Sequence, residues 1–338
     1  MASTLAGVGH GSEPMDNVVT RPRKSAGGEM VSSIVYIALG SDLLIALVKF
    51  VAAHYTGSSA MLSEGVHSLV DATTGVLLIY GLRLSRAPST ADHQLGFGRE
   101  VFFWNFIVAL TILALGSGVA LVDGIRQYVS PRPIETPLVS YCVLLVSFTL
   151  EAYSLYSAAR EAGLGKGRRS LRRYIMQSRD ATSLTVLFGS TSGILGVAIT
   201  AVGTLCSTTF DCPQYDGIAS ILIAIILGIT ALFLARSSKD LLIGVPATRA
   251  IITSILAMTA DHPLVRCANG SLSVHLAPDQ ILVALSVEFL PEGTTQTIQD
   301  AITQIDRNVR QAHPEVVIFL VKPQSASHFQ LIKKTRGW

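Results

Sequence analysis

Three ionisable residues stand close together in an otherwise apolar stretch of the chain, SEGVHSLVDATTG at residues 63–75. They are Glu64, His67 and Asp71. Because they are spaced i, i+3 and i+7, all three project from one face of an α-helix. An imidazole and a carboxylate four residues apart, as in His67 and Asp71, can both bind one metal ion. The alternatives are a buried hydrogen bond between these two side chains, and a role for Glu64 only in packing or at the mouth of a cavity.

The whole chain has the composition of a membrane protein. Of its 338 residues, 49% are hydrophobic and 14% are charged, and the mean hydropathy is +0.49, whereas about 25% of the residues in soluble domains are charged. An ionisable side chain at the centre of a membrane helix costs roughly 2.5–3.5 kcal/mol, so such residues usually face a cavity, a partner or an ion path.

The net charge of +3 is too small to indicate a nucleic-acid partner. The sequence has no paired nucleophile and base, nucleotide loop or cofactor motif, so we expect neither an enzyme nor a bound cofactor.

Six segments of about 20 residues are apolar enough to cross the ~30 Å hydrocarbon layer of a membrane. They lie at roughly 32–54, 60–81, 101–122, 137–158, 182–204 and 217–236. Lysine and arginine gather in residues 1–30 and in the loops 82–100 and 159–181, whereas the alternate loops hold only Arg126 and Arg132. The positive-inside rule therefore predicts an integral, multi-pass membrane protein with both termini in the cytosol.

The pattern changes after about residue 245, where a small α+β domain is predicted. Side chains that alternate between apolar and polar indicate a strand with one buried face, and the apolar ones are Ile281, Val283, Leu285, Val287 and Phe289. Helical spacing follows at Ile298, Ile302, Ile305 and Val309, and then the strand-like VVIFLV. We expect a disordered cytosolic tail over 1–30, a six-helix transmembrane domain over 31–240, a cytosolic α+β domain over 245–325 and a tail over 326–338.

Four stretches together resemble the cation diffusion facilitators, divalent-metal transporters with six membrane helices and a cytosolic, metallochaperone-like domain of ferredoxin-like fold. The stretches are GSSAMLSEGVHSLVD, DHQLGFGREVFFW, DLLIGV and HPEVVIFLVKP, and the resemblance covers roughly residues 30–325. The first stretch is most similar to the zinc-transporter-nine-like branch. The resemblance implies a homodimer, formed through the cytosolic domain, that exports zinc, manganese, iron or cobalt from the cytosol, usually against inward protons.

The resemblance also implies where the metal binds. The family's motif in its second helix falls on His67 and Asp71. The family takes its other two ligands from the fifth helix, but there this sequence reads VLFGSTSG, with Gly189 and Ser190 in place of acids. A serine hydroxyl is a weak neutral ligand, so four strong zinc ligands cannot be assembled by simple transfer of the motif.

Two further carboxylates are candidates for the site. Asp42 lies 16 residues before Ser58 and Asp71 lies 13 after it, so across a tight turn at ~1.5 Å per residue they differ in depth by less than one helical turn. The related branch usually has asparagine at the position of Asp42, so this residue is a candidate ligand, and an ion pair with Lys49 is the alternative. Glu151 occupies a family-like acidic position, near the ion or proton path or hydrogen-bonded to a neighbouring helix.

Two hypotheses about function remain open on these residues. In the first, an exporter binds a divalent cation through neutral His67 and ionised Asp71, which are reprotonated from the opposite side; an imidazole that titrates near pH 6.5 suits such an exchange. In the second, the chain has lost half of its site and serves as a non-transporting subunit of a heterodimer with an active transporter. An oxygen-rich ligand set favours manganese or iron, whereas the Irving–Williams order favours zinc.

Overall fold

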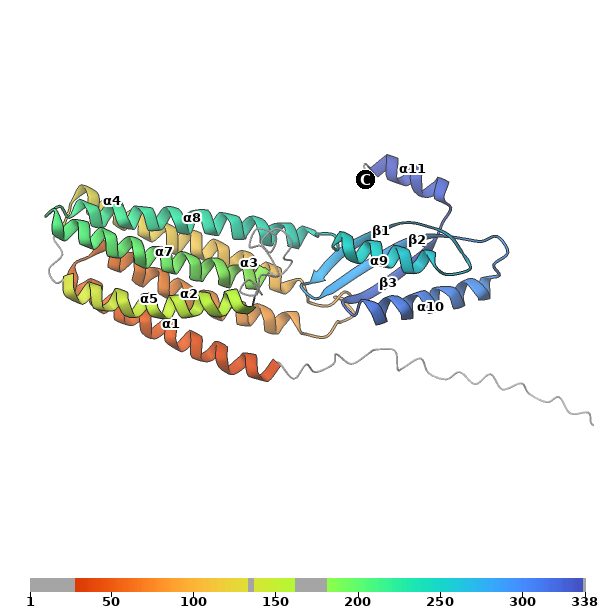
Figure 1. The fold of residues 1–338 in the computed structure, drawn as a ribbon, viewed down its shortest axis with the longest axis horizontal. Helices are drawn as coiled ribbons and strands as arrows, with labels where there is room; N and C mark the ends of the chain where they lie inside the picture. The colour runs from red at the N-terminus through yellow and green to blue at the C-terminus, as the bar shows by residue number, and fades with distance from the viewer. Residues whose placement is uncertain (1–27, 133–136, 162–180, 337–338) are drawn as a thin grey trace, which may run out of the picture. The chain divides into compact units, whose positions relative to one another are not determined.

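The computed structural model describes residues 28–132, 137–161 and 181–336, and the side chains of the first helix from Asp42 onward. The predicted tail 1–30 and the basic loop 159–181 lie almost entirely outside these residues. The first part of the chain is helical (Figure 1), with α1 Gly28–Thr56, α2 Ser59–Ser85, α3 Glu100–Thr111, η1 Ile112–Ser117, α4 Gly118–Val129, α5 Pro137–Glu161, α7 Ala181–Thr209 and α8 Gln214–Ile243. The elements α3, η1 and α4 follow one another without a break, and η1 is a π-helical turn within one long helix.

Five helices among the described residues are long and apolar enough to cross a membrane. They are Ser59–Ser85, Glu100–Val129, Leu138–Ser157, Thr182–Thr209 and Gln214–Ile243. Each coincides with one of the six predicted segments, so the prediction of an integral, multi-pass membrane protein is confirmed. The remaining segment, 32–54, falls in α1, part of which lies outside the described side chains.

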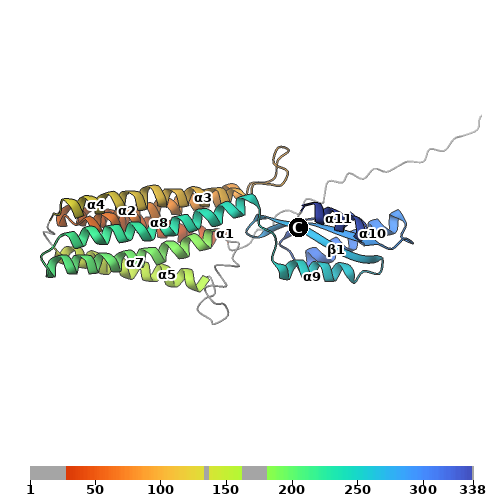
Figure 2. The ribbon, with the colours of Figure 1, turned by 90° about the horizontal axis from the view of Figure 1, so that it is seen from above.

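The helices pack side by side as a bundle, as Figures 1 and 2 show, with α8 in contact with α3, α4 and α7. Small residues permit the closest approach, because a Cβ atom at Gly124 of α4 would lie 2.9 Å from the carbonyl oxygen of Gly217 on α8. The buried core between the helices is aliphatic; its members are Val70, Leu78, Val108, Ala109, Ile112, Leu184, Ile223, Leu227, Ala231 and Leu234. Many large apolar side chains are instead exposed on the outside of the bundle, as expected where lipid takes the place of water.

The turn between α1 and α2 is held by an aspartate from α8. Asp216 is fully buried, and its carboxylate accepts hydrogen bonds from Ser58 Oγ at 2.7 Å and from the backbone N–H groups of Ser59 at 2.6 Å and Ala60 at 3.1 Å. The first N–H groups of a helix have no acceptor within the helix. Asp216 therefore caps α2 from another helix, and this fixes the start of the helix that carries the candidate residues.

The C-terminal part forms a three-stranded sheet with helices. Its elements are α9 Arg249–Ala260, β1 Val265–Ala277, β2 Gln280–Phe289, α10 Thr295–Ala312, β3 Val316–Pro323 and α11 Ala326–Arg336. The strands lie in the order β1-β2-β3; β1 and β2 are antiparallel, while β2 and β3 are parallel and are joined through α10. The predicted alternation is confirmed, because Ile281, Val283, Leu285 and Val287 are all at most 2% exposed.

Residues 326–338, expected to form a tail, contain α11. Ser325 Oγ accepts the backbone N–H of His328 at 3.4 Å, and Glu288 Oε2 accepts that of Ala326 at 2.7 Å. One of the two partners that satisfy the first turn of this helix therefore comes from β2, 38 residues earlier in the sequence.

Replacing Asp216 with alanine tests the cap. Two buried backbone N–H groups would lose their acceptor, at about 1–3 kcal/mol each, so the thermal unfolding midpoint of the protein purified in detergent should fall by several degrees. The control is Asp240→Ala, at an exposed position of the same helix, which should leave the midpoint unchanged. Equal midpoints for both variants would show that Asp216 does not hold the turn.

Candidate metal site

The centre of the candidate site is a histidine and an aspartate on the buried face of α2. His67 is 2% exposed, and its Nε2 lies 3.3 Å from Asp71 Oδ2, whose side chain is 25% exposed. Among the described residues no hydrogen-bond partner is found for either ring nitrogen of His67. The i, i+4 spacing read from the sequence thus brings the two groups together, and the imidazole keeps a buried nitrogen that is not engaged in holding the fold.

Glu64 is engaged in a different interaction from the one expected of a ligand. Its Oε2 lies 2.9 Å from the ammonium nitrogen of Lys49, which also donates to Ser68 Oγ at 2.8 Å. Both charged side chains are 0% exposed. No salt bridge between Lys49 and Asp42 is found in the described part of the chain. The ion pair with Lys49 that the sequence offered as the alternative role of Asp42 is made by Glu64 instead.

Two more carboxylates lie within electrostatic range of this centre. Asp42 on α1 interacts with Lys49, His67 and Asp71, and Glu151 on α5 interacts with His67 and Asp71. The cluster therefore draws on three helices and contains four carboxyl groups, one ammonium and one imidazole. With all four carboxylates ionised and the imidazole neutral, its formal charge is −4 + 1 = −3. A divalent cation and one proton would bring this charge to zero, which a buried cluster requires.

Helix α7 has no acidic residue of its own, but carboxylates from neighbouring helices pack against it. A Cβ atom at Gly193 of α7 would lie 2.6 Å from Cδ of Glu151, and one at Gly196 would overlap Oε1 of Glu64. Because real Cβ atoms do not approach other atoms so closely, these two positions admit only glycine while the carboxylates stay where they are. The glycine face of α7, formed by Gly193 and Gly196, thus leaves room for one carboxylate from α2 and one from α5 beside a helix that has no acidic side chain.

Ser190 also lies on α7 but is already hydrogen-bonded. Its hydroxyl is 2.9 Å from that of Ser154 on α5, and its side chain is buried. Gly189 has open space at its Cβ position. The pairing of Lys49 with Glu64 and the approach of Glu151 to Gly193 were not predicted, and the only signal in the sequence was the glycine spacing of the segment GSTSGILG.

Across the described residues, no group of three or more His, Cys, Asp or Glu side chains is spaced to hold one metal ion. His67 and Asp71 are a pair, and the nearest further carboxylates come from other helices. Coordination of an ion by three or four groups therefore requires side chains of α1 or α5 to move toward the pair on α2.

Together, the fold and the site define a multi-pass membrane protein with a buried cluster of carboxyl groups around His67. The sequence model of the cation efflux transmembrane domain matches residues 35–243, more than half of the chain. The protein therefore belongs to the cation efflux family of metal transporters, which confirms the predicted family.

Named relatives support the predicted zinc-transporter-nine-like branch. The chain is 28% identical over 276 residues to the mitochondrial proton-coupled zinc antiporter SLC30A9 of Homo sapiens, covering 80% of this chain and 48% of that protein. It is 28% identical over 257 residues to Metal tolerance protein C4 of Arabidopsis thaliana, covering 75% and 56%. Its identity to the cation-efflux pump FieF of Escherichia coli strain SMS-3-5 is 32% over 123 residues, covering 36% and 40%. The chain spans about half the length of these relatives.

The buried ion pair can be tested through stability. Lys49→Met leaves Glu64 as an uncompensated buried charge, and breaking a buried pair in this way costs about 3–5 kcal/mol. We expect a lower yield of folded protein in size-exclusion chromatography and a lower thermal midpoint. The double variant Lys49→Met with Glu64→Gln removes both charges and should recover most of the loss. A single variant as stable as the wild type would contradict the buried ion pair.

Proposed function

We propose that this protein transports a divalent metal cation, exporting zinc, manganese, iron or cobalt from the cytosol in exchange for protons. The observation that carries the proposal is the pair of His67 and Asp71 on the buried face of α2, surrounded by further carboxylates. A cluster with an excess of buried negative charge attracts a cation, and the retained proton acceptors suit exchange for protons.

The proposal includes the arrangement of the protein in the membrane. We propose six spans, with α1 as the first, both termini in the cytosol, and a C-terminal domain of ferredoxin-like, metallochaperone-like type that forms a homodimer or a heterodimer with a related transporter. The order of a helix, two strands, a helix and a strand, with a parallel crossover through α10, supports this domain type. The name of SLC30A9 as a proton-coupled zinc antiporter supports the exchange and the metal class.

Within the proposed site the residues have separate roles. His67 and Asp71 are the central ligands, and Asp42 approaches them from α1. Glu151 provides from α5 a carboxylate that α7 lacks, either as a ligand or on the proton path. Ser190 remains a weak candidate because its hydroxyl is bonded to Ser154, and Glu64 balances Lys49.

The non-transporting subunit is the second candidate function. It is favoured by one observation: the described residues hold no group of three metal-binding side chains ready to surround an ion. One experiment separates the two functions. The purified chain alone is reconstituted into proteoliposomes, and uptake of zinc, manganese, iron and cobalt is compared across an imposed pH gradient. Movement of any of these metals excludes the non-transporting function, and no movement of any of them contradicts the transporter.

His67→Ala and Asp71→Asn should each abolish metal uptake in proteoliposomes while leaving expression and thermal midpoint close to the wild type, because both residues are proposed ligands. Asp42→Asn should be similarly damaging. Unchanged uptake in the first two variants would refute the assignment of the site. A loss of folded protein would show that the pair serves as a structural hydrogen bond instead.

The glycine face of α7 allows a matched test of Glu151. Gly193→Ala must displace the Glu151 carboxylate, whereas Gly189→Ala, about one turn away on the same helix, enters open space. We expect Gly193→Ala and Glu151→Gln to reduce uptake at least tenfold and Gly189→Ala to leave it near the wild-type level. If both alanine variants transport equally, the placement of Glu151 has no part in transport.

A further inference from the structure

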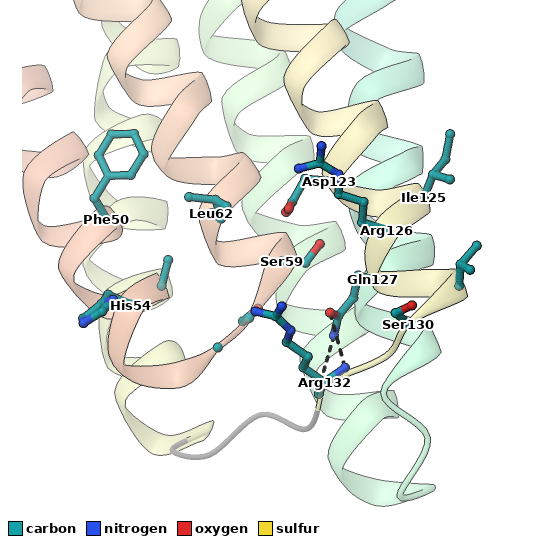
Figure 3. Close-up of a pocket in the computed structure, with 14 residues that line it drawn as sticks. Phe50, His54, Ser59, Leu62, Asp123, Ile125, Arg126, Gln127, Ser130 and Arg132 are labelled. Carbon is teal, nitrogen blue, oxygen red and sulfur yellow. Dashed lines mark hydrogen bonds between the residues drawn. The ribbon is translucent and has the colours of Figure 1, made fainter.

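A cavity of about 760 Å³ opens at the end of the bundle where α1 turns into α2. Figure 3 shows Phe50 and Leu62 on the side of α1 and α2, and Asp123 and Arg126 on the side of α4. The cavity lies at the helix ends, away from the cluster around His67, and nothing in the proposed transport uses its residues. Its lining combines polar groups at the turn and on α4 with apolar side chains such as Phe50, Leu62 and Ile125.

Among the described residues the charged groups of the cavity form no salt bridge, although the Asp123 side chain is hydrogen-bonded to Ser59 and interacts electrostatically with Arg126 and Arg132. Arg126 and Arg132 both line it, and within the described ranges neither guanidinium forms a salt bridge. Asp123 lines the same wall, and its Oδ2 is buried with no hydrogen-bond partner found in the described part of the protein. A ligand in the cavity would therefore meet two guanidinium groups and one carboxylate oxygen that lacks a donor.

The segment that carries Arg132 is held in place. Gln127 is 5% exposed; its Nε2 donates to the carbonyl oxygen of Arg132 at 2.8 Å and its Oε1 accepts the Arg132 N–H at 3.4 Å. These bonds, drawn in Figure 3, tie the end of α4 to the following residues and keep the backbone of Arg132 at the cavity. The buried side chain of Gln127 therefore fixes one edge of the cavity.

The position of the cavity at the helix ends and the residues of its walls indicate an amphipathic ligand. Tyr55 and Tyr128, at the same helix ends, are 66% and 53% exposed, and exposed tyrosines are enriched at the level of lipid headgroups. The apolar wall continues outward through Ile125 and Val129, which are 48% and 72% exposed. A ligand with a polar head at the turn and an apolar tail along α4 matches both parts.

We propose that this cavity binds a phospholipid whose headgroup carries both a phosphate and a primary ammonium. The phosphate lies between Arg126 and Arg132, where guanidinium groups can form paired hydrogen bonds with phosphate oxygens. The ammonium donates to Asp123 Oδ2, which lacks a donor, and an acyl chain follows Ile125 along α4. A purely anionic headgroup would leave Asp123 Oδ2 without a donor, and a metal ion would be repelled by the two arginines.

The test uses the full-length protein in detergent and measures retained lipid by native mass spectrometry, together with the shift of the thermal midpoint. The probes are phosphatidylethanolamine, phosphatidylglycerol, and soluble glycerophosphoethanolamine, which has the headgroup without acyl chains. We expect one phosphatidylethanolamine per chain, bound at least tenfold more tightly than phosphatidylglycerol or the soluble headgroup. Equal binding of the two lipids would overturn the role of Asp123, and equal binding of the soluble headgroup would show a site for a free phosphate compound.

Variants connect the binding to the cavity. Arg126→Gln with Arg132→Gln should weaken phosphatidylethanolamine binding at least tenfold, while Arg236→Gln, at an exposed position of α8 outside the cavity, should not change it. Asp123→Asn, which keeps the size of the side chain, should abolish the preference for phosphatidylethanolamine over phosphatidylglycerol and still bind both. Wild-type binding by the double arginine variant, or an undiminished preference in Asp123→Asn, would overturn the proposal. The isosteric variant keeps the test decisive if the double variant fails to fold.

Discussion

Charge buried inside an apolar helical bundle has to be compensated inside the bundle, because neither water nor lipid headgroups reach its middle. In this protein the constraint is met by Lys49, which pairs with Glu64 between α1 and α2 and is fully buried. The pair neutralises one carboxylate of the cluster permanently. In the proposed site the remaining acids, Asp42, Asp71 and Glu151, are the ones that would exchange a cation for protons, whereas Glu64 carries a structural charge.

The packing of α7 follows from the same constraint. A helix that carried its own acids would place them directly in the cluster, but here the acids come from α2 and α5 and need room at their tips. Gly193 and Gly196 provide that room, because any side chain there would overlap a carboxylate. The proposed site therefore draws on α1, α2 and α5, and small movements of α5 relative to α2 would change the distance between Glu151 and His67.

The start of α2 and the part that carries the candidate site are held in different ways. At its start, Asp216 caps the helix from α8, and Ser59 bonds to Ser220 at 2.9 Å. At the level of the site, α2 meets α7 through glycine and α1 through an ion pair. The capped start of α2 lies beside the proposed lipid cavity, whose lining includes Ser58 and Ser59.

The sequence by itself determined the class of the protein, because hydrophobic length and charge distribution depend on each residue alone. Five of the predicted spans, the alternating strand of the C-terminal domain and the contact of His67 with Asp71 were read correctly, since each rests on the period of a single element. Only the tertiary structure decided which partner each buried charge takes. Lys49 lies 15 residues from Glu64, Asp216 about 160 residues from the turn it caps, and Glu151 reaches a glycine on the next helix. Such pairings depend on how helices are rotated against one another, and no periodicity within one helix contains that information.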